Sequence, residues 1–188
     1  MLTFPDRNRP RPITMGKLEG NVMAADASPN AKSMSIIVTK GTLDWAYPPF
    51  ILATTAAAMD VKVTMFFTFY GLALLKKDLD LSVTTLGNSA MEMPMMGGHM
   101  KMPNIMGALP GMTGLTTAMM KNMIKKKGVA SIEELREAAQ ISDVRLIACQ
   151  MTMDLFEYKQ SGMLEGVEYA GAATYMENAL KSDINLYI

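Results

Sequence analysis

The chain of 188 residues carries 18 basic and 18 acidic side chains, and 49% of its residues are hydrophobic. This length and composition fit one globular domain and exclude a disordered chain. Nucleic-acid binders usually carry an excess of basic residues, whereas the net charge of this chain is zero. No nucleic-acid partner is therefore expected. A single cysteine excludes an internal disulfide and fits a reducing compartment.

The N-terminal part of the chain has no periodic pattern. Residues 1–32 are rich in Pro, Arg, Asn and Asp, which predicts a flexible N-terminal arm. This arm lacks the apolar region of a secretory signal. The most apolar stretch, 65–75, is much shorter than the roughly 20 residues of a membrane-spanning helix. We therefore expect a cytoplasmic protein, with peripheral membrane association as an open alternative.

From residue 33 onward, short β-branched and aromatic runs alternate with helical patterns. The runs that predict strands are 33–39, 61–69, 81–87, 144–149, 166–171 and 184–188. The patterns that predict helices are 43–60, 71–78, 114–128, 131–142 and 172–183. Pro48 and Pro49 are expected in a first helical turn, where missing N–H groups cost little. Ser131 and Glu134 form an S-x-x-E capping box, and Gly128 should close the helix before it.

This alternation predicts an α/β fold, with a parallel and mostly buried sheet that has helices on both faces. Sheets of this kind bind ligands or react at the carboxyl ends of their strands. The loops that follow Thr39, Phe67, Leu86 and Cys149 are therefore the places where a site is expected.

Cys149 is the first candidate functional residue. A lone cysteine in an apolar strand is a core residue by default. However, Cys149 is the last residue of its predicted strand, and the following QMTMDLFEY can open a helix. A helix N-terminus stabilises a thiolate, which favours a nucleophilic or sulfur-carrying thiol. Gln150 and Thr152 are the candidate supporting residues, and from the residues alone both interpretations stay open.

The methionine-rich loop at about 88–112 is the second candidate. Twenty-one methionines stand in the chain, concentrated between Met91 and Met123. Thioethers with the single histidine, His99, could bind Cu(I). The favoured interpretation is that these adaptable apolar side chains cover a crevice or pack a subunit interface.

Other chemistries are poorly supported by the sequence. One cysteine and one histidine, far apart along the chain, give weak grounds for a hydrolase triad or a zinc site. No phosphate-binding loop or dinucleotide-binding motif is present. No motif implies a metal or a cofactor.

Three segments together resemble the DsrE/DsrF-like family, in its larger subtype with a methionine-rich insertion. They are ILATTAAAMDVKVTMFFTFYGLALL, IMGALPGMTGLTTAMMKNMIKKKGVASIEELREAAQISDVRLIACQMTMDLF and GVEYAGAATYMENALKSDINLYI. The resemblance covers nearly everything from Met34 to Ile188, and ACQMTMD is its most specific part. It implies that residues 33–188 form one flavodoxin-like α/β domain.

The resemblance also implies a function in sulfur trafficking. The family's cysteine that carries sulfane sulfur as a persulfide corresponds to Cys149. We therefore expect a sulfur carrier or sulfurtransferase. Such a protein carries a persulfide from one partner to another, unlike a classical enzyme that turns over a substrate. Because the chain has no second cysteine, donor and acceptor thiols must come from small molecules or carrier proteins. The alternative is a non-enzymatic interaction or Cu(I)-binding module that acts through the methionine-rich loop.

The excess of methionine and aromatic side chains predicts apolar surface that a monomer would leave in water, and the resemblance also implies a closed oligomer. The protein should therefore be a homo-oligomer, with part of the region from Met91 to Met123 buried between subunits. The chain also departs from the family pattern, because Glu157 and Tyr158 follow MDLF where relatives have Gly, and Tyr70 stands where Trp is expected. The first departure could alter the helix after Cys149.

Overall fold

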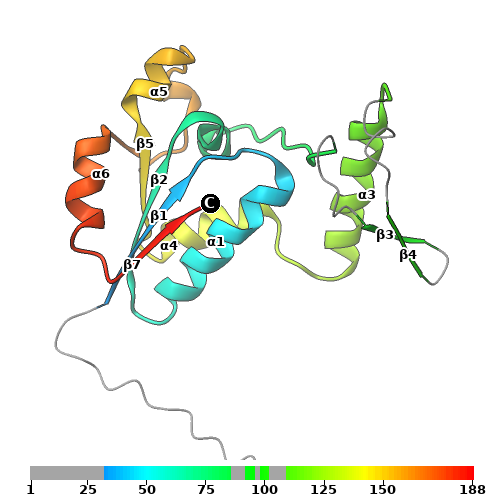
Figure 1. Cartoon of the computed structure of the whole chain (residues 1–188), viewed down its shortest axis with the longest axis horizontal. Coiled ribbons are helices and arrows are strands. Elements are labelled where there is room, and N and C mark those ends of the chain that lie inside the picture. The colour runs from blue at the N-terminus through cyan, green and yellow to red at the C-terminus, as the bar shows by residue number, and fades with distance from the viewer. Residues whose placement is uncertain (1–31, 86–91, 96–97, 102–108) are drawn as a thin grey trace, which may run out of the picture. The chain divides into compact units, whose positions relative to one another are not determined.

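The computed structural model describes residues 32–85, 92–95, 98–101 and 109–188. The predicted N-terminal arm lies outside the described residues, apart from Lys32. Five strands form one sheet in the order β6-β5-β2-β1-β7, and every neighbouring pair is parallel (Figure 1). The strands are β1 Ser33–Val38, β2 Lys62–Phe67, β5 Arg145–Cys149, β6 Glu168–Ala170 and β7 Ile184–Tyr187. The predicted parallel α/β sheet is confirmed.

Helices cover both faces of this sheet (Figure 1). Alternate residues of β5 show the division, since successive side chains of a strand point to opposite faces. Leu146 and Ala148 belong to the large core cluster that includes α1 (Leu43–Ala57) and α4 (Ile132–Ile141). Ile147 and Cys149 pack with Tyr175 of α6 (Ala172–Ala179) on the other face.

The remaining elements connect these layers. They are the 3₁₀ helix η1 (Phe69–Leu75), α3 (Met112–Lys126), α5 (Gln150–Leu155) and the 3₁₀ turn η2 (Gln160–Gly162). The capping box at the start of α4 is confirmed, since Ser131 N donates to Glu134 Oε2 and Glu134 N donates to Ser131 Oγ. Gly128 has φ 67° just after α3, where a left-handed residue ends a helix.

No helix among the described residues is long and apolar enough to cross a membrane.

The strand predicted over 81–87 is wrong in its described part, which has no strand partner. The Ser82 carbonyl accepts from Leu43 N at 2.9 Å, and Thr84 N donates to Asp44 Oδ1 at 3.0 Å. Since the N-terminal turn of α1 satisfies these backbone groups, they need no neighbouring strand.

The segment predicted as the methionine-rich loop, at about 88–112, contains a pair of antiparallel strands. These are β3 (Glu92–Met95) and β4 (Gly98–Lys101). Their register places Glu92 opposite Lys101.

The position predicted for the two prolines is also wrong. Helix α1 begins at Leu43, so Pro48 and Pro49 lie inside the helix, beyond its first turn. The helix starts this early because Thr42 is extended, with φ −93° and ψ 159°, and the buried side chain of Leu43 anchors the first helical residue in the core. Proline in a helix interior removes a backbone hydrogen bond.

Glu157 occupies a left-handed position at the end of α5. Its φ is 53°, and the next amide, Tyr158 N, donates to the Met153 carbonyl at 2.9 Å. Glycine adopts such a backbone conformation without steric cost, whereas a side chain resists it. Glu157 therefore carries a local backbone strain at this position.

We predict that Glu157→Gly raises the free energy of unfolding by about 0.5–1 kcal/mol, because glycine relieves the left-handed strain. Urea denaturation of the two proteins measures the difference. Glu137→Gly, at an exposed position inside α4, is the control and should lower stability by about 1 kcal/mol. Destabilisation by both changes would contradict the assigned backbone conformation of Glu157.

Candidate functional site

Cys149 ends β5 at the carboxyl edge of the sheet, and α5 begins at the next residue. Its backbone is extended, with φ −67° and ψ 111°, and it serves as the N-cap of α5 without a side-chain capping bond. The predicted sequence of strand, thiol and helix is therefore present. The side chain is 4% exposed.

The thiol lies in an apolar environment on the α6 face. Cys149 belongs to a cluster with Phe66, Ile147 and Tyr175, and Ala170 is its register partner on β6. The ring of Tyr175 stacks on Phe66, with the ring centroids 4.9 Å apart. A thiol covered in this way reacts with a molecule from solution only after a neighbouring element moves.

The two candidate supporting residues make other contacts. Gln150 Nε2 donates to Asp154 Oδ1 at 2.7 Å, along the surface of α5. Thr152 is fully buried, and its hydroxyl lies 3.1 Å from Thr68 Oγ1. Among the hydrogen bonds of the described residues, neither side chain reaches the Cys149 sulfur. Thr152 instead ties the segment that follows β2 to the start of α5.

The sequence analysis expected a site in the loop after Phe67 but named no residue there, because its predicted strand ran on to Phe69. Phe69 has φ 48°, and its amide donates to Thr152 Oγ1 at 3.4 Å. Gly71 packs directly on β1, where a Cβ atom would lie 2.2 Å from the Val38 carbonyl oxygen. The FYG triplet at 69–71 is the signal that could have been used, because a glycine after a strand often marks a close backbone approach.

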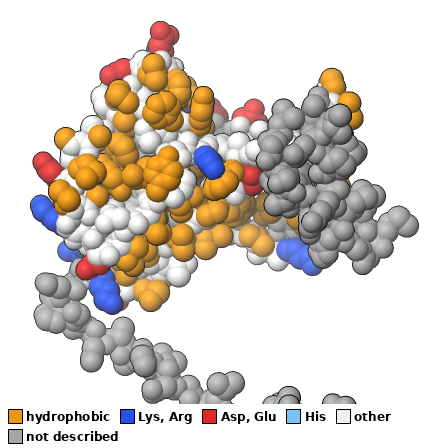
Figure 2. All heavy atoms as spheres, in the orientation of Figure 1, with side chains coloured by type: hydrophobic (Ala, Val, Ile, Leu, Met, Phe, Trp, Pro, Cys, Tyr) orange, Lys and Arg blue, Asp and Glu red, His pale blue; other side chains and the backbone are white. Residues whose placement is uncertain are grey.

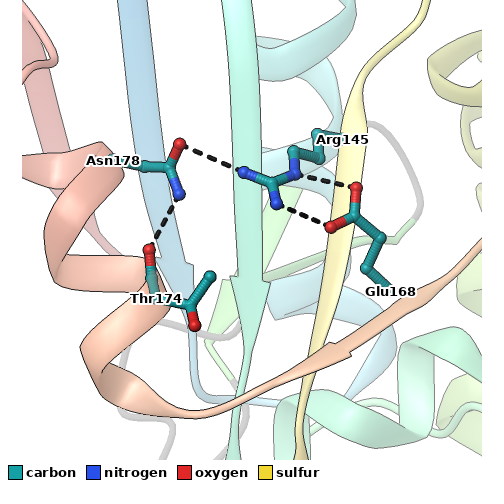
Figure 3. Close-up of polar contacts among 4 residues, drawn as sticks. All are labelled: Arg145, Glu168, Thr174 and Asn178. Carbon is teal, nitrogen blue, oxygen red and sulfur yellow. Dashed lines mark hydrogen bonds and ion pairs between the residues drawn. The ribbon is translucent and has the colours of Figure 1, made fainter.

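A polar network holds α6 at the opposite end of β5 (Figure 3). Arg145 forms two hydrogen bonds with the Glu168 carboxylate of β6, at 2.8 and 2.6 Å. Its third nitrogen donates to Asn178 Oδ1 at 3.1 Å, and Asn178 in turn donates to the Thr174 carbonyl at 2.8 Å. Arg145 and Cys149 are four residues apart on one strand, so both face α6.

The methionine-rich loop gives no described metal site. His99 lies on β4 opposite Pro94. Within the described residues, no group of three or more His, Cys, Asp or Glu side chains could hold a metal ion. The alternative of Cu(I) binding falls on side chains between 86 and 108, which lie outside the described residues.

Two cavities lie away from the thiol. One of about 750 Å³ lies among α1, α3 and α4, and Tyr47, Ile124 and Ile132 contribute to its lining. The other, of about 500 Å³, lies at the amino ends of the strands beside Arg145. Cys149 lines neither cavity, so we place the candidate site by the position of the thiol and not by cavity size.

The ion pair between Arg145 and Glu168 predicts a pH-dependent contribution to stability. The hydrogen bonds from Arg145 lower the pKa of the Glu168 carboxyl. The pair should therefore contribute fully above the ordinary glutamate pKa of about 4.3, and lose its contribution as pH falls through the lowered pKa. We expect Glu168→Gln to be less stable than the wild type at pH 6, and the difference to close on acidification.

Denaturation in urea at a series of pH values measures this difference. Glu177→Gln, at an exposed position on α6, is the matched control and should change stability little at any pH. A wild-type advantage over Glu168→Gln that stays constant from pH 6 down to pH 3 would contradict the assignment.

The chain is similar to known proteins over most of its length. The model of the DsrE/DsrF/DrsH-like family matches residues 30–187. Sulfur carrier protein DsrE2 of Allochromatium vinosum is 61% identical over 158 residues, which cover 84% of this chain and 98% of that protein. Uncharacterized protein YrkE of Bacillus subtilis is 35% identical over 160 residues, covering 84% and 97%. The crystal structure of the ychN protein from E. coli aligns with a TM-score of 0.45 at 12% identity, covering 84% of this chain and 99% of that one.

Proposed function

Because the chain belongs to the DsrE/DsrF/DrsH-like family, we propose that it is a sulfur carrier that holds sulfane sulfur as a persulfide on Cys149. The observation that carries the proposal is the 61% identity to a protein named as a sulfur carrier, over 98% of that protein's length. Cys149 is the only cysteine in the chain, so it is the only thiol that could hold the sulfur.

The proposed chemistry consists of two balanced exchanges. In loading, the Cys149 thiolate attacks the outer sulfur of a donor persulfide, and the donor leaves as a thiolate. In release, an acceptor thiolate attacks the outer sulfur of the Cys149 persulfide. The bond between that sulfur and Cys149 Sγ breaks, and Cys149 leaves as a thiolate. The sulfur atom moves without a net gain or loss of electrons, so no cofactor is required.

The position of Cys149 supports this chemistry. The first backbone N–H groups of α5 have no helical partners, and such groups stabilise an anion at the start of a helix. Burial opposes the charge on the sulfur, because a covered thiolate loses hydration. We infer that both exchanges take place in a locally opened state, in which the contacts of Cys149 with α6 are broken while the sheet stays intact.

The proposed partners are donor and acceptor thiols, since this chain cannot supply the second thiol itself. The protein would then act as a carrier that changes partners more than as an enzyme that turns over a substrate. A cytoplasmic location fits a protein whose only cysteine must stay reduced between exchanges.

We predict that polysulfide treatment adds about 32 Da per sulfur atom to the intact protein, and that a reducing thiol removes the added mass. Cys149→Ser should gain nothing, because the chain then has no thiol. Intact-protein mass spectrometry gives both results. The wild type alkylated at Cys149 beforehand is the control for sulfur bound elsewhere. A wild-type mass that several donors leave unchanged would contradict the proposal.

We further propose that the protein is a homo-oligomer. After Asp44, α1 has no charged residue, yet Trp45 and Leu52 are exposed one above the other on its outer face. Figure 2 shows hydrophobic side chains gathered over the region of α1 and β7. On α3, within the region from Met91 to Met123, Leu115 and Met119 are exposed four residues apart. Apolar helical faces of this kind favour association with another copy.

The predicted assembly has a mass above the 20.5 kDa of one chain in light scattering after size exclusion. If α1 forms the contact, Trp45→Lys with Leu52→Glu should give the monomer. If α3 forms it, Leu115→Glu with Met119→Lys should do so. Leu180→Glu, at an exposed position directly after α6, is the control. A wild-type mass of 20.5 kDa at all concentrations would refute the assembly.

A further inference from the structure

The helix α6, which covers Cys149, packs on the sheet through few side chains. It lies on the face of the sheet opposite α1 and α4 (Figure 1). Among its eight residues, Tyr175 is the only one that is buried. A helix of two turns is not stable in water by itself, so its position depends on packing against the sheet. The packing of α6 therefore depends mainly on Tyr175.

Tyr175 contacts the sheet in two ways. Its ring stacks on Phe66 of β2, and both residues belong to the buried cluster that contains Cys149. Its hydroxyl lies 3.0 Å from Ser35 Oγ on β1. The Ser35 hydroxyl donates its own hydrogen to Asn185 Oδ1, so the Tyr175 hydroxyl must be the donor to Ser35. One side chain thus supplies both an apolar contact and a buried hydrogen bond.

The two ends of α6 differ in their polar contacts. Near the carboxyl end, Asn178 accepts a hydrogen bond from Arg145. No hydrogen bond of the described residues joins residues 172–174 of the first turn to a neighbouring element. This amino end follows β6, whose last residue is the register partner of Cys149. On the side of the thiol, Tyr175 is therefore the residue that holds the helix against the sheet.

The contacts of Tyr175 can break without leaving an unpaired donor in the core. When α6 moves away, water binds the Tyr175 hydroxyl, and Ser35 keeps its bond to Asn185 of β7. A buried donor that lost its only partner would cost more than this exchange of one hydrogen bond for another. The release of Tyr175 therefore costs little beyond the exposure of its ring, and it leaves the pairing of β1 with β7 intact.

We propose that Tyr175 controls access to Cys149. While its ring and hydroxyl contact the sheet, α6 covers the thiol, and their release exposes it. For a sulfur carrier the consequence is protection of the carried sulfur, a role that rests on the proposed persulfide of Cys149.

The reaction that the cover prevents is loss of the sulfur to a small thiol. A glutathione thiolate attacks the outer sulfur of an exposed persulfide, and the bond between that sulfur and Cys149 Sγ breaks. Cys149 leaves as a thiolate, and glutathione becomes the persulfide. Tyr175 takes no part in this exchange and acts only through the position of α6.

The first test measures the rate at which iodoacetamide alkylates Cys149 in the unloaded protein without urea. This rate depends on the fraction of molecules in the opened state. Tyr175→Phe keeps the ring and removes the hydrogen bond, so the rate should rise about fivefold. Tyr175→Ala also removes the ring and should raise the rate further. Equal rates for the wild type and Tyr175→Phe would overturn the proposal.

Two control variants separate access to the thiol from global stability. Tyr47→Phe removes another tyrosine hydrogen bond, to the Ala130 carbonyl at 3.1 Å, on the other face of the sheet. Glu137→Gly, in α4, should lower global stability about as much as Tyr175→Phe does. Both controls should leave the alkylation rate unchanged. If either raises it as much as Tyr175→Phe does, the thiol is exposed by global unfolding and the proposal is overturned.

A combination of changes tests the bond between Tyr175 and Ser35. Ser35→Ala should raise the alkylation rate about fivefold or more, because it leaves the Tyr175 hydroxyl buried without an acceptor. The bond from Ser35 to Asn185 is present in the closed and the opened state, so its loss does not alter the opening. In a Tyr175→Phe protein, Ser35→Ala should therefore add little. Effects that multiply would contradict the role of this hydrogen bond.

The second test uses polysulfide-loaded protein and glutathione, and intact-protein mass spectrometry follows the loss of about 32 Da. Tyr175→Phe should lose its sulfur about fivefold faster than the wild type. If Cys149 takes up no sulfur, the proposed function fails, whereas the alkylation rates still decide whether Tyr175 controls access. If Tyr175→Phe is alkylated faster but both loaded proteins lose sulfur at equal rates, the protection of the persulfide is overturned.

Discussion

The pairing of β5 between β2 and β6 is the constraint on which the rest of the structure depends. Its five residues alternate between the two faces of the sheet, so Arg145, Ile147 and Cys149 all face α6. Arg145 holds β6 and α6 at the amino end of the strand. Cys149 lies at the other end, where β5 gives way to α5. The strand β5 therefore positions both the thiol of Cys149 and the helix α6 that covers it.

This arrangement is compatible with both the burial of Cys149 and its proposed reactivity. The Cys149 side chain is as buried as a core residue, yet it stands at the edge where parallel sheets react. The cover over it comes from α6, a helix of eight residues. The polar contacts of Arg145 and Asn178 anchor this helix away from the thiol. Opening at the carboxyl edge can then occur while the amino edge stays paired, as expected for a local motion of low free energy.

Local sequence patterns predicted the elements that carry a local signal. The capping box of α4 depends on contacts within three residues, and the apolar run that ends at Cys149 marks β5 as a buried strand before its partners are known. The segment 81–85 was predicted wrongly because its backbone groups bind the start of α1, about 40 residues earlier. The pair of Arg145 and Glu168 depends on the strand register and could not be read from spacing alone. The left-handed Phe69 was missed since aromatic residues rarely adopt that conformation.

The rate at which iodoacetamide alkylates Cys149 at low urea concentrations tests the central claim most directly, namely that a local opening exposes this thiol. A local opening exposes little surface, so the account predicts a rate that hardly changes with urea below the unfolding transition. Cys149 would be a core residue, and the account would be contradicted, if the rate rose with urea as steeply as the global unfolding equilibrium. In that case the thiol would become accessible only when the whole domain unfolds.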